Sequence, residues 1–163
     1  MQRIRDDIDN LVAAWERAVA RGDTDCAQRT AQPLIDFYAS RGPYSRERDI
    51  IKQTWALPVN DPSVRACFAV FASRAYGRHG DMENCSALLD HANQFREVLV
   101  DEGLDLELTY ALGMQANHKG EFDEATRVFA EVIEEARARG QWHTVARAAT
   151  ASGTTLQLSL IHI

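Results

Sequence analysis

The stretch that decides the fold is Leu112–Ala136, LGMQANHKGEFDEATRVFAEVIEEA. Its pattern predicts a helix that carries Leu112 and Gly113, a turn at Gly120, and a second helix that buries Phe129. Two helices of this kind cannot cover their own apolar faces. The stretch therefore predicts neighbouring helix pairs of the same kind.

A turn of the same composition occurs at Gly22–Ala27, Gly80–Cys85 and Gly120–Ala125, and each reads glycine, acid, any residue, acid, any residue, small residue. The glycine can end a helix in the left-handed conformation. The acids then stand at the positively polarised N-terminus of the next helix. The glycines of the last two turns lie 40 residues apart, and so do Gly113 and Gly153. Turn and period together predict an internal repeat, with a chance bundle of helices as the alternative.

Apolar residues recur at spacings of three and four along most of the chain, and β-branched alternation is scarce. This pattern favours an all-α fold. We predict a single domain over residues 1–163, a right-handed stack of antiparallel helix hairpins (an α-solenoid) with about eight helices. The predicted parts are hairpins at about 3–41, 63–102 and 105–139, a half repeat from 141, and an inserted helix and loop at 43–62. Gly103 is expected to end the middle hairpin, and Pro33 to kink or fray its helix.

The composition argues against several classes of function. The net charge is −6 and the pI is about 5.3, and basic residues do not cluster, so direct nucleic-acid binding is not expected. A transmembrane helix needs an apolar run of about 18 residues or more, and every apolar run in this sequence is much shorter. We therefore expect no membrane contact. The three cysteines are widely spaced, which suits thiols in a reducing cytoplasm. We therefore expect a cytoplasmic protein.

No set of residues has the spacing of a catalytic or metal site. The five histidines form no HExxH-like pair, and no GxxxxGK[ST] phosphate-binding loop occurs. Cys85 stands at the small position of its turn, where we expect a buried, unreactive thiol rather than a nucleophile. The three tryptophans lie on apolar stripes and are expected in the core. We expect no enzymatic activity, no cofactor and no metal.

The hairpin at 105–139 resembles a tetratricopeptide (TPR) repeat, because Leu112, Gly113, Ala125 and Phe129 stand where that family places its packing residues. Matching positions in the middle hairpin are Tyr76, Leu89 and Ala92. The period of 40 exceeds the usual TPR period of about 34 residues. It resembles the divergent TPR arrays of large bacterial signalling ATPases. The resemblance implies a surface that binds a protein or peptide.

The segment Asp9–Ala18, DNLVAAWERA, followed by Arg21-Gly22-Asp23, resembles the segment after the NB-ARC module in bacterial STAND-type, LuxR-like transcriptional regulators. By that resemblance, the chain would be the non-catalytic sensor array of such a regulator, acting in signal transduction and transcription regulation. Its partner would be a protein or peptide, or other domains of the same parent protein. Two alternatives stay open, a TPR tail of a kinase or cyclase and a freestanding TPR adaptor.

The candidate binding surface follows from helix geometry. First helices of stacked hairpins line a concave groove, and at about 100° per residue one face of each such helix is turned toward it. The residues assigned to this partner-binding groove are Arg74, Arg78, Glu107, Tyr110, Met114, Asn117 and His118. Val70 shares the face of the two arginines. Such a groove could hold a peptide with a carboxylate and an apolar side chain, and an empty, solvated face is the equal alternative.

The last six residues, Leu158–Ile163 (LSLIHI), read like the translation of a sequencing-library adaptor. We regard them as a candidate non-native tail, and the chain as a fragment whose last helix lacks its partner. The underlying DNA sequence tests this interpretation.

Overall fold

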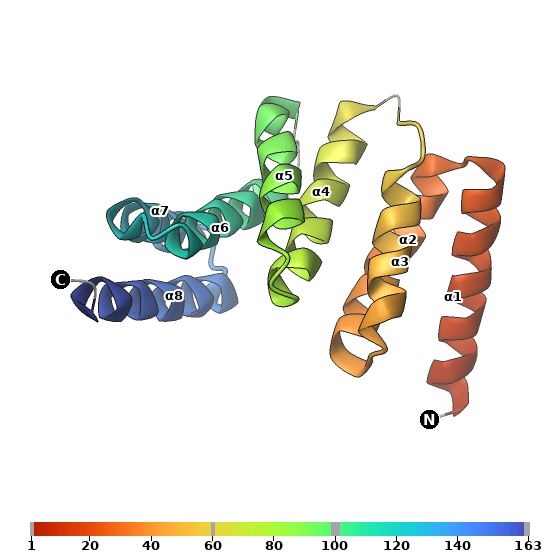
Figure 1. The fold of residues 1–163 in the computed structure, drawn as a ribbon, viewed down its shortest axis with the longest axis horizontal. Coiled ribbons are helices and arrows are strands. Elements are labelled where there is room, and N and C mark those ends of the chain that lie inside the picture. The colour runs from red at the N-terminus through yellow and green to blue at the C-terminus, as the bar shows by residue number, and fades with distance from the viewer. Residues whose placement is uncertain (1, 60, 99–101, 162–163) are drawn as a thin grey trace. The chain divides into compact units, whose positions relative to one another are not determined.

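In a computed structural model of the chain, the regular structure is helical throughout the part that it describes, residues 2–59, 61–98 and 102–161 (Figure 1). Side chains are described for residues 7–59, 61–97 and 103–160. Eight α-helices and one short 3-10 helix form in these residues, so the predicted all-α class with about eight helices is confirmed there. The helices belong to two compact units, Met1–Val98 and Leu99–Ile163.

The first unit contains α1 (Gln2–Arg21), α2 (Thr24–Arg41), α3 (Tyr44–Trp55), α4 (Pro62–Arg78), α5 (Met82–Gln94) and the 3-10 helix η1 (Arg96–Val98). Helix α2 packs against α1, α3 and α4, and α4 packs against α5. Trp15 of α1 is buried, and its indole Nε1–H donates a hydrogen bond of 2.9 Å to Thr54 Oγ1 of α3. The inserted helix α3 is therefore part of the core of this unit.

The second unit contains α6 (Glu102–His118), α7 (Phe122–Ala138) and α8 (Trp142–Ile161). Helix α7 packs against both α6 and α8. Phe129 of α7 is fully buried and forms one core cluster with Ala116 and Ala125. The members of a second cluster are Leu106, Val132, Ala136 and Ala148. The aromatic residue that the sequence places in the core is thus at the centre of this unit.

The predicted left-handed turns are confirmed. Gly22, Gly80 and Gly120 have φ angles of 67°, 72° and 79°, a conformation that glycine adopts without steric cost. In each turn, the N–H of the next residue donates to a carbonyl five residues earlier, as Glu121 does to Ala116 at 3.0 Å. This bond satisfies a carbonyl at the helix end that would otherwise lack a partner.

One of the predicted helix ends is wrong. Helix α5 ends at Gln94, and Gly103 lies in the first turn of α6 instead of ending the preceding helix. A glycine is tolerated in the first turn of a helix with ordinary helical φ, so its presence alone does not mark a C-terminus. Helix α2 continues through Pro33. That proline is exposed, so water can reach the carbonyl that loses its hydrogen-bond donor.

The tryptophans divide between core and surface. Trp15 is buried as predicted, whereas Trp142 is 69% exposed and the core prediction for it is wrong. Trp142 is the first residue of α8, and α7 does not cover it. None of the described helices has the length and apolarity needed to span a membrane. Of the candidate non-native tail, His162 and Ile163 lie outside the described residues, and Leu158–Ile161 belong to α8.

Candidate functional site

A groove of about 450 Å³ runs between α6 and α8 in the second unit. Its volume falls in the range of about 300–1,000 Å³ that is typical of ligand sites. The lining residues are Tyr110, Met114 and Asn117 from α6, and His143, Ala146, Arg147, Thr150, Ala151 and Thr154 from α8. The three residues from α6 all belong to the groove predicted from the sequence.

The floor of this groove is apolar and held in place by the core. Tyr110 and Met114 pack against the cluster around Phe129, and Ala151 of α8 packs against the same cluster. The ring centroids of Tyr110 and Phe129 lie 5.7 Å apart, a favourable distance for an aromatic pair. A ligand in the groove would therefore meet a surface that is already fixed by packing.

Arg147, which lines the groove, already forms an ion pair with Glu107. The Arg147 guanidinium lies over the Tyr110 ring, 4.4 Å from its centroid, and its Nη1 donates to Glu107 Oε1 at 2.6 Å. The side chains of Arg147 and Glu107 are 27% and 22% exposed, so both charges are partly withdrawn from water. This ion pair joins α6 to α8 and leaves the groove without excess charge at this point.

Asn117 lines the groove, but its Oδ1 faces away from solvent. That oxygen is buried and has no hydrogen-bond donor among the described residues, which costs roughly 1–3 kcal/mol. Exposed acceptors in the groove are the hydroxyl oxygens of Thr150 and Thr154, whose own protons go to backbone carbonyls.

The other predicted groove residues lie elsewhere. His118 is the exposed last residue of α6 and does not line the groove. Glu107 does not line it either and is connected to it through Arg147. Arg74 and Arg78 belong to α4 in the first unit, where Arg74 is half-buried and Val70 is fully buried.

Arg78 has a structural partner that the sequence analysis missed. Its Nη2 donates to Glu47 Oε1 at 2.5 Å, and His79 Nε2 lies 2.8 Å from Glu47 Oε2. The Glu47 side chain is fully buried, and a buried carboxylate depends on such partners. The arginine therefore connects α3 to the end of α4 instead of presenting a free cation to a ligand.

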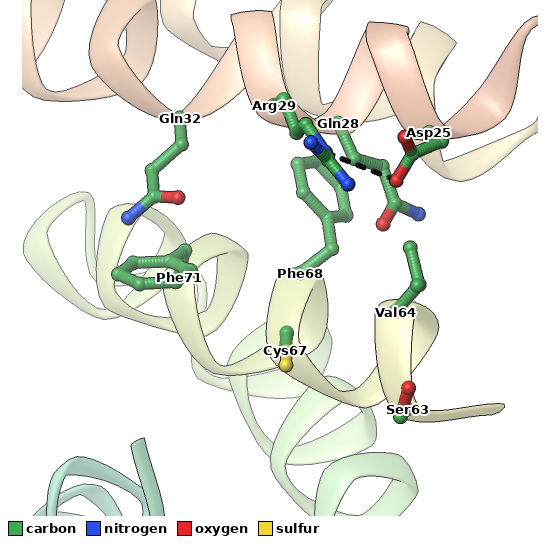
Figure 2. Close-up of a pocket in the computed structure, with 9 residues that line it drawn as sticks. All are labelled: Asp25, Gln28, Arg29, Gln32, Ser63, Val64, Cys67, Phe68 and Phe71. Carbon is green, nitrogen blue, oxygen red and sulfur yellow. Dashed lines mark hydrogen bonds and ion pairs between the residues drawn. The ribbon is translucent and has the colours of Figure 1, made fainter. Parts of the chain in front are cut away.

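A smaller cavity of about 210 Å³ lies between α2 and α4 in the first unit. Figure 2 shows Gln28 pointing from α2 toward α4, with Phe68 and Val64 pointing back from α4. Gln28 is 6% exposed, and its Nε2 has no acceptor among the described residues. A cavity of about 150 Å³ holds one benzene, so this one has room for little more than a single side chain. The α6–α8 groove is the better candidate because it is about twice as large.

Neither thiol nor metal chemistry is evident in these regions. Cys85 is buried as predicted, and burial raises the pKa of its thiol, which lowers the fraction of nucleophilic thiolate. Within the described residues, no group of three or more histidine, cysteine, aspartate or glutamate side chains could hold a metal ion.

Comparison of the chain with known proteins gave no match to a protein-family model, to a curated protein or to a solved structure.

Proposed function

We propose that the chain is a non-catalytic protein-interaction module and that its α6–α8 groove binds a peptide segment of a partner. One observation carries the proposal. Tyr110, Met114 and Asn117, which the sequence assigns to one binding face, line a groove that has an apolar floor.

The architecture that we propose is a right-handed stack of antiparallel, TPR-like hairpins. It is supported by three left-handed turns of one residue pattern and by the close packing at Gly113, where an added Cβ would lie 2.8 Å from Phe129 Cε1. In such a stack, α6 and α8 are first helices of successive hairpins, and their exposed faces line the concave surface.

The ligand that fits the groove is an extended peptide with an apolar side chain. The side chain would contact Tyr110 and Met114, and backbone N–H groups would donate to the exposed hydroxyl oxygens of Thr150 and Thr154. Arg147 is paired with Glu107 and Arg78 with Glu47, so a ligand carboxylate is not required. This modifies the sequence-based expectation of a carboxylate-bearing peptide.

The biological setting that we propose is the sensor region of a bacterial signalling ATPase or transcriptional regulator, where the partner is a protein, a peptide or another domain of the same parent. The support is the resemblance of Asp9–Asp23 to the segment after NB-ARC modules. The genomic sequence upstream of Met1 tests this setting. An NB-ARC module there supports it, whereas a kinase or cyclase domain, or a true start codon, contradicts it.

A displayed random-peptide library selected on the immobilised chain tests the binding site. We expect the selected peptides to lose about tenfold in affinity on Met114→Glu, which places a charge on the apolar floor, and on Thr150→Val, which removes a hydroxyl acceptor of the groove. The matched control is His118→Ala, an exposed change outside the groove. Circular dichroism checks that all three variants remain helical. Selected peptides that bind both groove variants as tightly as the parent chain would exclude the α6–α8 groove.

A further inference from the structure

One face of α8 carries a continuous row of uncovered apolar and small residues. Its members are Trp142, Ala149, Gly153, Leu156 and, within the candidate non-native tail, Leu160. Their spacings of seven, four, three and four place them on one side of the helix. Trp142, Leu156 and Leu160 are 69%, 51% and 73% exposed, and they are three of the four large hydrophobic residues exposed in the described part of the chain. We name this row the outer face of α8.

The outer face is separate from the other two faces of α8. The side packed on α7 carries Thr144, Ala148 and Thr155, all of which are buried. The side toward the α6–α8 groove carries Arg147 and Thr150. No residue of the outer face lines that groove, so an inference about the outer face is independent of the proposed function.

The equivalent face of α6 shows how such a surface is covered. The 40-residue period aligns Gly113 with Gly153 and Ala116 with Leu156. On α6, this face is buried under α7, because a Cβ added to Gly113 would lie 2.8 Å from Phe129 Cε1. The glycine thus provides the hollow that accepts the phenyl ring of the next helix.

The space beside Gly153 is open to solvent. A Cβ added there would meet nothing within 4 Å. A glycine inside a helix costs about 1 kcal/mol relative to alanine, and the described residues give this one no compensating contact. A close approach by another helix is the usual reason for such a glycine. The neighbouring Leu156, half exposed, would be buried by the same approach.

We propose that the outer face of α8 docks an amphipathic helix that presents a large aromatic side chain to Gly153, as α7 presents Phe129 to Gly113. The internal spacing favours this occupant, because Gly153 follows Gly113 by 40 residues and Gly113 receives the Phe129 ring of α7. A second copy of the chain, which carries its own exposed Trp142 on this face, is the other occupant, and sedimentation distinguishes the two.

A synthetic peptide covering residues 120–139, which contains α7, is the probe for this docking. We expect the fluorescein-labelled peptide to bind the full chain in an anisotropy titration, and its Phe129→Ala version to bind about tenfold more weakly. On the chain, Gly153→Leu adds a side chain at a position where a Cβ meets no atom within 4 Å, and it should weaken peptide binding by a similar factor. The matched control, Thr154→Leu, changes an exposed residue on the groove side of α8 and should bind like the parent.

Several results would overturn the proposal. Absence of peptide binding up to about 1 mM would remove the docking site. Equal affinity for the Gly153→Leu chain would mean that the peptide binds elsewhere, for example on α6 by displacing α7. Equal affinity of the Phe129→Ala peptide would exclude the ring as the anchor. Sedimentation that shows a dimer of the chain alone, abolished by Leu156→Asp, would assign the face to a second copy.

Discussion

Gly113 of α6 and Gly153 of α8 lie 40 residues apart in the sequence and have opposite surroundings. At Gly113, the ring of Phe129 and a methyl group of Val128 fill the space of a side chain, whereas at Gly153 that space is open. Ala116 beside the first glycine is 7% exposed, and Leu156 beside the second is 51% exposed. The comparison teaches that one residue pattern serves as internal packing on one helix and as an available docking surface on the next.

The largest expected effect comes from removing the Phe129 ring, which packs against Gly113. Phe129→Ala removes a fully buried ring and should lower the free energy of unfolding by about 3–5 kcal/mol, because truncation of a core phenylalanine loses burial and leaves a cavity. Urea titration followed by circular dichroism measures the change. A loss below about 1 kcal/mol would mean that α7 does not depend on the ring for its packing on α6.

An intermediate effect is expected from giving α6 the residue that α8 has. Ala116→Leu places a larger side chain against Ala125 and Phe129, and overpacking of this kind costs about 1–3 kcal/mol. The same urea titration measures it. An unchanged unfolding midpoint would show that the α6–α7 contact can accommodate a leucine at position 116. Close packing on α6 would then no longer distinguish this helix from α8.

The smallest effect on the free energy of unfolding is expected at Leu156, on the exposed side of α8. Leu156→Ala changes a half-exposed side chain of α8, and both residues have high helix propensity, so the free energy of unfolding should change by less than about 0.5 kcal/mol. Differential scanning calorimetry provides the comparison with Ala116→Leu. A loss as large as that of the α6 variant would show that the outer face of α8 is already packed.

Local chemistry made much of this fold and part of the site predictable. The three turn glycines need a positive φ, and each has one, because the physical reason lies within a few residues of sequence. Helix periodicity alone placed Tyr110, Met114 and Asn117 on one face, and all three line the groove.

Features that depend on distant contacts were not predictable in the same way. Glu47 lies in the first turn of α3, where an acid is normally solvated at the helix N-terminus. It is buried because Arg78 and His79, more than 30 residues later, meet it. The same contact explains why the assignment of Arg78 to a binding surface was unsupported.

Arg147 is an intermediate case, since the signal for it was present in the sequence. It follows Glu107 by 40 residues, the spacing that also separates Gly113 from Gly153. Extending the groove prediction from α6 to α8 by this spacing would have found both Arg147 and the opposite wall of the groove.

The most direct test of the contrast between α6 and α8 is one pair of alanine substitutions measured under identical conditions by urea unfolding. Gly113→Ala must displace the buried Phe129 ring and should lower the free energy of unfolding by about 1–2 kcal/mol, even after the gain in helix propensity. Gly153→Ala meets no atom and should raise it by up to about 1 kcal/mol. Opposite signs are the predicted result. Changes of the same sign in both variants would contradict close packing at Gly113 and open space at Gly153.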